Sequence, residues 1–241
     1  PNTLYYVRAY ATNTAGTSYG SETSFTSSVI APTANSQAAG SVSSTGATLN
    51  GTVNANNAST TVTFEYGTST SYGAEVTAAQ SPLSGTTDTA VSAEITGLSP
   101  YTTYHFRVKA INDGGTSYGE DLSFLTSAVA PTVTTQAVTD TTATTATGNG
   151  SITDLGVPNP TQHGVCWSTS AGPDINDNKT EQGAAGAIGA FTGSITGLAP
   201  NTLYYVRAYA TNPAGIVYGG EVSFTTLALP PDVNAQAATA L

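Results

Sequence analysis

Hydrophobic and polar residues alternate along short stretches of this chain, with a period of two. In the stretch YHFRVKA at residues 104–110, Tyr, Phe, Val and Ala fall on one face, and His, Arg and Lys fall on the other. Residues 62–66 alternate in the same way. This period predicts β-strands that are buried on one side. Turn residues such as NDGG at residues 112–115 separate the strands, and no stretch has the apolar spacing of a helix, so we expect an all-β fold.

The strands belong to a repeat of roughly a hundred residues. Three segments align without gaps: PNTLYYVRAYATNTAGTSYGSETSFTS from Pro1, PYTTYHFRVKAINDGGTSYGEDLSFLT from Pro100 and PNTLYYVRAYATNPAGIVYGGEVSFTT from Pro200. A second marker runs in step with them: PTANSQA from Pro32, PTVTTQA from Pro131 and PDVNAQA from Pro231. Each unit therefore begins near the second marker and ends in the SF(T/L)T strand.

The repeat predicts that the given sequence starts and stops partway through a unit. The predicted parts are the last two strands of a truncated domain at residues 1–27, whole domains at 32–127 and 131–227, and the first strand of a following domain at 230–241. The connectors are short and end at or just before a proline: Ser28–Ala31, Ser127–Ala130 and Leu227–Pro230. Because such connectors limit swivelling, we expect an extended, semi-rigid array.

About seven short strands in each unit, each with one apolar face, predict a β-sandwich. The segments GLSPYTTYHFRVKAINDGG and GLAPNTLYYVRAYATNPAG resemble the L-x-P-x-T-x-Y-x-x-R-V-x-A-x-N segment of fibronectin type III domains, and the repeats resemble those of bacterial secreted and cell-surface proteins. The resemblance implies seven-stranded, immunoglobulin-like sandwiches. It also implies that Leu98 with Tyr104, and Leu198 with Tyr204, form a corner in which the tyrosine hydroxyl bonds nearby backbone.

The units depart from the fibronectin pattern in two ways. The tryptophan usual in the second strand is missing, and Trp167 stands in the third strand instead. An Arg-Gly-Asp tripeptide is also absent from the sequence, so integrin-type adhesion is not implied.

Residues 1–27 predict a two-stranded ribbon with an apolar face of Tyr5, Val7, Ala9, Ala11 and Phe25. An isolated ribbon is marginally stable in water, and each large apolar side chain left exposed costs about 1.5–3 kcal/mol. These strands therefore need partners. Two sources remain open: strands that lie upstream in a longer polypeptide, or strands that another molecule supplies.

The chain is acidic, with a formal net charge of −10 from five Lys and Arg against fifteen Asp and Glu. Such a surface repels phosphate backbones, so nucleic acid is not an expected partner. The single cysteine, Cys166, excludes an intramolecular disulfide. We find no signal peptide and no apolar run that would span a membrane. The lack of Met and the excess of Thr, Ser and Gly suit an exported bacterial protein.

Aromatic and guanidinium side chains alternate on the polar face of the sixth strand, as in many protein contact surfaces. The predicted contact surface consists of Tyr6, Arg8, Tyr10, Tyr205, Arg207 and Tyr209. The alternative is an ordinary cross-strand ladder on an exposed sheet. The middle unit has His105, Arg107 and Lys109 at these positions, which argues against one repeated ligand site.

Other candidate sites are weaker. The loop Asp174–Asn178 carries oxygen ligands at alternate positions but lacks the EF-hand glycine and glutamate, so a solvated loop is the favoured interpretation over calcium binding. By its register Cys166 falls on the outward face, where it is either a cross-linking thiol or a small residue under a loop. His105 and His163 lie in different units without a catalytic partner, so we expect no catalytic residue, no metal and no cofactor.

These features predict a non-catalytic structural or adhesive segment of an extracellular bacterial array, such as a surface fibre. Its expected partners are neighbouring domains or further copies of the same array, with a surface glycan as another. The alternative is a spacer or carbohydrate-binding accessory region of a secreted polysaccharide-degrading enzyme. Both place the chain outside the cell.

Overall fold

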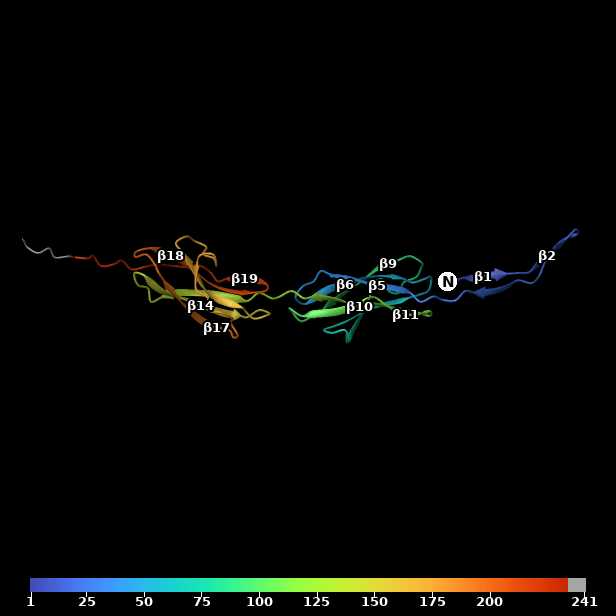
Figure 1. Cartoon of the computed structure of the whole chain (residues 1–241), viewed down its shortest axis with the longest axis horizontal. Coiled ribbons are helices and arrows are strands. Elements are labelled where there is room, and N and C mark those ends of the chain that lie inside the picture. Colours follow the sequence, from blue (N-terminus) through green and yellow to red (C-terminus); the bar gives the residue numbers. More distant parts are fainter. Residues whose placement is uncertain (234–241) are drawn as a thin grey trace, which may run out of the picture. The chain divides into compact units, whose positions relative to one another are not determined.

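The structure is a computed structural model that describes residues 1–233. All regular secondary structure in these residues is β-strand, as the period-two pattern predicts (Figure 1). A helix capable of spanning a membrane is not found within this part of the chain. The chain divides into two compact units, Pro1–Ser127 and Ala128–Leu241. We call them unit 1 and unit 2 and describe each by itself.

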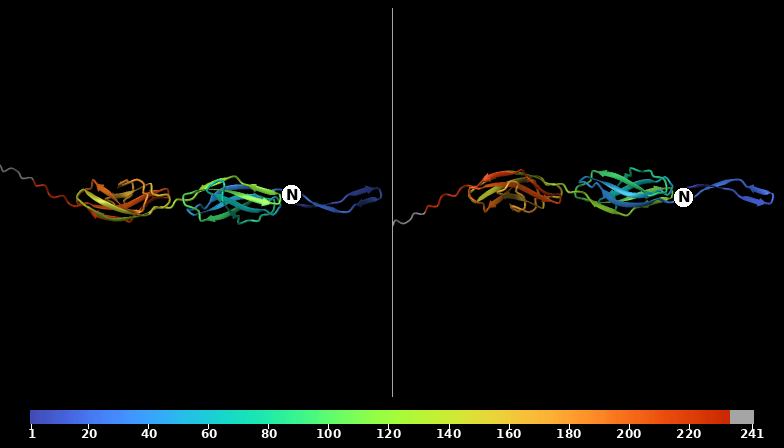
Figure 2. Two further views of the ribbon diagram at one scale, coloured as in Figure 1. Left: turned by 90° about the horizontal axis from the view of Figure 1, so that it is seen from below. Right: turned by 90° about the horizontal axis from the view of Figure 1, so that it is seen from above.

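Unit 1 contains a sandwich of two antiparallel sheets (Figure 2). The first sheet has the order β5-β6-β9, with β5 at Thr33–Gly40, β6 at Gly46–Asn54 and β9 at Thr89–Thr96. The second has the order β8-β7-β10, with β8 at Ala74–Thr77, β7 at Thr61–Gly67 and β10 at Thr103–Asn112. The outer side of β10 pairs with β11 (Gly115–Tyr118) and then β12 (Leu122–Leu125), two halves of one interrupted edge strand.

Unit 2 repeats this topology. Its first sheet is β13-β14-β17, with β13 at Thr132–Thr139, β14 at Thr145–Asp154 and β17 at Gly189–Thr196. Its second sheet is β16-β15-β18, with β16 at Asn178–Lys179, β15 at Gln162–Ser168 and β18 at Leu203–Asn212. The edge strand is again in two halves, β19 (Gly215–Tyr218) and β20 (Val222–Thr225). The predicted fold class, tandem fibronectin-like β-sandwiches, is confirmed.

Alternate residues of the paired strands form each core. In unit 1 Leu49 from β6, Phe64 from β7 and Phe106 from β10 are completely buried between the two sheets. The residues that the alternation placed inward in β7 and β10 belong to this core or pack against it. Burial of these side chains is the main favourable term in folding.

The predicted tyrosine corner is present in both units. The backbone N–H of Ser99 donates to the Tyr104 hydroxyl at 3.0 Å, and that of Ala199 donates to the Tyr204 hydroxyl at 3.0 Å. Leu98 and Leu198 are buried beside them. This hydrogen bond fixes the loop that precedes the sixth strand to a side chain of that strand.

A hydroxyl from the first strand of each sandwich completes the pairing of the sixth strand. The N–H of Val108 in β10 donates to Ser36 Oγ at 3.2 Å, and the N–H of Ala208 in β18 donates to Thr135 Oγ1 at 2.9 Å. These amides lie opposite Gly119 and Gly219, where the edge strand is interrupted. A Cβ at Gly119 would lie 2.3 Å from Ser36 Oγ, so the close approach requires glycine.

The two units fill their cores differently. The position of Leu49 in β6 is taken by Gly148 in β14, where a Cβ would lie 3.0 Å from Val165. Val165 and Ile195 line the position of Gly148, Phe191 from β17 lies over Gly150, and Trp167 from β15 is buried in the same cluster. The core of unit 2 therefore contains a tryptophan from the third strand, although the second strand has none.

Glutamine side chains cover the outer edge of the first sheet. In unit 1 Gln80 Oε1 accepts from the backbone N–H of Ser92 in β9 at 2.8 Å. In unit 2 Gln182 Nε2 donates to the carbonyl of Thr192 in β17 at 2.8 Å. Covered edges hinder pairing with strands of other molecules.

Residues 1–27 form the predicted ribbon, in which β1 (Leu4–Val7) pairs with β4 (Thr23–Thr26), and β2 (Tyr10–Asn13) with β3 (Gly16–Tyr19). Tyr5 stacks on Phe25 at 5.5 Å between ring centroids, as Tyr104 stacks on Phe124 at 5.9 Å. Tyr5 is 50 % exposed, whereas Tyr104 in its complete sandwich is 9 % exposed. The ribbon therefore has the geometry of the last strands of a unit and an open apolar face.

The domain limits at residues 32–127 and 131–227 stay a prediction. For the strand predicted at residues 230–241, residues 230–233 belong to no strand, and residues 234–241 lie outside the described part.

Cys166 is buried, so of the two alternatives the small residue under a loop is confirmed and the exposed cross-linking thiol is wrong. The register does place it opposite Arg207, on the face away from the core. The segment after β15 folds back over this face, and Cys166 Sγ lies 3.5 Å from the carbonyl oxygen of Pro173. Burial raises the pKa of the thiol to about 11.

We expect Tyr204→Phe to destabilise unit 2 by about 1–3 kcal/mol, because the Ala199 N–H loses its acceptor. Urea denaturation followed by the fluorescence of Trp167, the only tryptophan of the chain, measures this. Tyr205→Phe is the control, since that hydroxyl makes no hydrogen bond within residues 1–233, and it should cost less than about 0.5 kcal/mol. Equal losses in the two variants would contradict a contribution from the corner.

We expect the Cys166 thiol to react slowly with a maleimide in the native chain. A thiol with a pKa of about 11 is roughly 0.1 % thiolate at pH 8, against about a quarter for a free thiol. Labelling in urea should be at least about 100-fold faster than native labelling. A native rate equal to the urea rate would show that the loop does not protect this residue.

Candidate functional site

The outer face of the sheet that contains the sixth strand carries the residues predicted as a contact surface. In the ribbon Tyr6 and Tyr10 are 66 % and 72 % exposed, and Arg8 is exposed between them. In unit 2 Tyr205 and Arg207 in β18 are half-buried. These five residues therefore lie at the surface, and whether they bind a partner stays a prediction.

Tyr209 is buried, and its assignment to the contact surface is wrong. The segment between β15 and β17 covers it, and its hydroxyl donates to the carbonyl of Thr180 at 2.7 Å. Burial raises the pKa of Tyr209 to about 12. The strand alternation placed it on the correct face of the sheet, but the alternation contains no information on which loop covers that face.

Each arginine of this face lies over a tyrosine of the interrupted edge strand, a pairing that the sequence reasoning missed. The guanidinium carbon of Arg107 is 4.0 Å from the Tyr118 ring centroid. The corresponding distances are 4.1 Å from Arg8 to Tyr19 and 4.5 Å from Arg207 to Tyr218. The equal spacing of Arg and Tyr in the three repeats was the available signal. Such cation–π contacts contribute about 0.5–1 kcal/mol at exposed sites.

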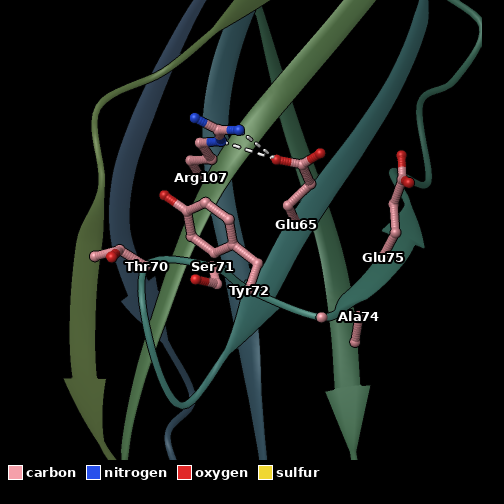
Figure 3. A pocket seen from close by; sticks show the side chains of 8 residues that line it. Glu65, Thr70, Ser71, Tyr72, Ala74, Glu75 and Arg107 are labelled. Atoms are coloured by element: carbon pink, nitrogen blue, oxygen red, sulfur yellow. Dashed lines mark hydrogen bonds and ion pairs between the residues drawn. The ribbon is translucent and has the colours of Figure 1, made fainter.

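In unit 1 this arginine is enclosed by further groups (Figure 3). Tyr72, from the loop after β7, covers it with its ring centroid 4.8 Å from the guanidinium carbon. Arg107 Nε and Nη2 each lie 2.8 Å from Glu65 Oε2. Lys109 lies 3.4 Å from Glu65 and 3.3 Å from Glu75, which adds two further ion pairs.

Asp121 extends this network at the other end. It accepts from the Tyr72 hydroxyl at 3.0 Å and lies 2.9 Å from His105 Nδ1. Burial, together with the bond to Asp121, raises the pKa of Tyr72. The acidic and basic side chains on this face of unit 1 therefore contact one another.

An open hollow of about 470 Å³ lies beside this network. Its lining is mostly polar and includes Glu65, Thr70, Ser71, Tyr72, Glu75 and Arg107. Such a lining suits a polar ligand held by hydrogen bonds. The ion pair between Arg107 and Glu65 leaves this arginine little capacity for another anion.

The remaining candidates serve local structure. In the loop Asp174–Asn178, Asp174 Oδ1 accepts from the N–H of Asn176 at 2.7 Å, and Asp177 Oδ2 accepts from the N–H of Asp174 at 3.0 Å. His163 Nδ1 lies 2.9 Å from the carbonyl of Gly183. No group of three or more metal-ligating side chains gathers anywhere in residues 1–233.

Comparison with solved structures gives distant matches. The FN1-FN3 domains of chicken CNTN1 are 16 % identical, with a TM-score of 0.36, over 92 % of this chain and 77 % of that one. The sensor domain of the anti-sigma factor RsgI4 in Pseudobacteroides cellulosolvens is 15 % identical, with a TM-score of 0.33, over 45 % of this chain and 100 % of that one. No curated protein matches the chain.

The family comparison agrees with the topology. The model of the fibronectin type III domain matches residues 42–124, which run from the loop before β6 into β12 of unit 1. Unit 2 repeats the strand order, the tyrosine corner and the interrupted edge strand of that domain. Residues 42–124 therefore match the fibronectin type III family, and the chain is built of tandem sandwiches of this fold.

Proposed function

We propose that this chain is a structural segment of an extracellular bacterial multi-domain protein, in which successive domains supply length, spacing and contact surface. The observation that supports this most directly is the repetition of one sandwich. Units 1 and 2 share their topology, and residues 1–27 repeat the last strands once more. Short connectors join these parts. A series of such modules in one chain suits a mechanical role.

The chemistry of the surface agrees with this proposal. The charged side chains that come together in unit 1 are paired with each other in the Glu65, Arg107 and Lys109 network. Paired surface charges fix side chains and add little stability. Fibronectin type III domains are common in extracellular proteins, which supports the proposed location.

The ribbon supports assembly with further strands. Its inner face leaves Tyr5, Val7 and Phe25 each 50–56 % exposed. Burial of each such side chain contributes about 1.5–3 kcal/mol. We therefore propose that a complementary sheet, equivalent to β5-β6-β9, covers the ribbon. It comes from another part of the polypeptide or from a neighbouring chain in a fibre.

The second candidate is an accessory or spacer region of a secreted polysaccharide-degrading enzyme. The tyrosine and arginine side chains on the outer face of β18 favour it, because aromatic rings stack on sugars. The two candidates differ in what the chain is attached to and in where the protein accumulates.

Immunogold electron microscopy tests the proposal. An antibody raised against residues 131–227 is applied to thin sections of cells of the organism that encodes the chain. We expect label outside the cell, along surface fibres, with cells lacking the gene as the control. Label only in the cytoplasm would contradict the proposal. Label absent from the surface, with the protein in the medium bound to a polysaccharide-degrading enzyme, would favour the second candidate.

A further inference from the structure

The arginine–tyrosine pair holds a carboxylate in unit 1. Arg107 rests on Tyr118, and Glu65 from the neighbouring strand β7 approaches the guanidinium group to 2.8 Å. Arginine recognises carboxylates well because its N–H donors form a rigid planar fork. In unit 1 the arginine therefore already binds a carboxylate of the same chain, that of Glu65.

Unit 2 has the same arginine–tyrosine pair, Arg207 and Tyr218, without a carboxylate bound to the arginine. The residue opposite Arg207 on β15 is Cys166, in the place that Glu65 has opposite Arg107. No carboxylate lies within 4 Å of Arg207 in the described part of the chain. A half-buried guanidinium without an anion is unusual in a chain of net charge −10.

Arg207 is nevertheless held in position. Its Nε donates to the carbonyl of Gly219 at 3.1 Å, and its guanidinium lies over the Tyr218 ring. The Tyr218 hydroxyl accepts from the N–H of Ile175 at 3.1 Å, which fixes the ring. Within residues 1–233 the two terminal amino groups of Arg207 make no hydrogen bond, so their donors remain unused by the chain.

Nearby carboxylates are engaged elsewhere. Asp174 and Asp177 accept backbone N–H groups of their own loop. Glu221 accepts from the N–H of Gly172. None of these forms an ion pair with Arg207.

The residues next to Arg207 indicate the class of ligand. Tyr205 lies two residues before it on the same face of β18 and pairs with Ser168 on one side and Ser223 on the other. An aromatic ring offers an apolar face to a sugar, and two hydroxyls flank it. In unit 1 the same positions hold His105, already paired with Asp121, and Gly67 opposite it.

We propose that Arg207, with Tyr205 beside it, is a binding site for a sugar acid, the carboxylate on the guanidinium and the ring on Tyr205. The ring and the hydroxyls favour a uronic acid residue of a glycan over an Asp or Glu side chain of a protein, which would use the arginine alone. Because the acidic chain repels polyanions as a whole, binding depends on a single carboxylate at this site. The site goes beyond the structural role proposed above and does not depend on it.

Calorimetric titration of the full chain with a galacturonic acid trimer at low salt tests the site. Arg8 also lies over a tyrosine without an ion pair in residues 1–233, so every protein carries Arg8→Gln. Arg207→Gln should weaken binding by roughly tenfold or more, since charge-assisted hydrogen bonds are lost. Arg107→Gln is the matched control and should change the affinity less than about twofold, because Glu65 already occupies that arginine.

Two further ligands separate the contributions. The neutral galactose trimer should bind at least roughly tenfold more weakly than the acidic one, and a triglutamate peptide should not bind better than the acidic sugar. Tyr205→Ala should weaken the binding of the trimer. Trp167 fluorescence and circular dichroism establish that each variant is folded. No binding of the trimer, equal binding by Arg207→Gln, equal binding of the neutral sugar, or preference for the peptide would each overturn the proposal.

Discussion

The sixth strand of each sandwich depends on one amide that its edge partner leaves open. Because β11 and β12 are separate halves, as are β19 and β20, the N–H groups of Val108 and Ala208 need another acceptor. Ser36 and Thr135 from the first strand provide it. A buried N–H without an acceptor would cost about 1–3 kcal/mol. This hydroxyl therefore bonds a strand of one sheet directly to a strand of the other, across the rim of the core.

The rest of the sandwich follows from this junction. The first strand can reach the sixth only where glycine leaves room, at Gly119 and Gly219. The same interruption separates the half of the edge strand that supports the arginine–tyrosine pair from the half that supports the tyrosine corner. In the ribbon Gly20 makes the corresponding bond to the carbonyl of Ala9, but no hydroxyl from a first strand reaches Ala9 in the described residues.

Alternation and repetition were sufficient to predict the strands and a β-sandwich in each repeat, because both depend on the backbone period. The seven-stranded topology and the tyrosine corner came from the resemblance to fibronectin type III domains, which a few fixed residues carry. Coverage by loops was not predictable in this way. Tyr209 lies on the expected face, but the segment between β15 and β17 differs in unit 2 and buries it. The same segment buries Cys166, for which cover by a loop was one of the two alternatives left open. The arginine–tyrosine pairs were missed because the strands that carry them are short and were not assigned a register. The core of unit 2 also required the structure, since Phe191 lies over Gly150 and Trp167 is buried in the same cluster.

The different cores of the two units have a consequence during synthesis. Neighbouring domains of similar sequence can exchange strands while they fold. Residues 1–13 and 200–212 are identical, but the sandwich of unit 1, β5 to β12, lies between them in the sequence, and its sixth strand has Phe106 where unit 2 has Val206. The smaller side chain would leave a void beside Phe64, and the larger one would crowd Trp167. An exchange of sixth strands between the two units would therefore destabilise both cores. This difference in side-chain size disfavours strand exchange between neighbouring domains while the repetitive chain is being synthesised.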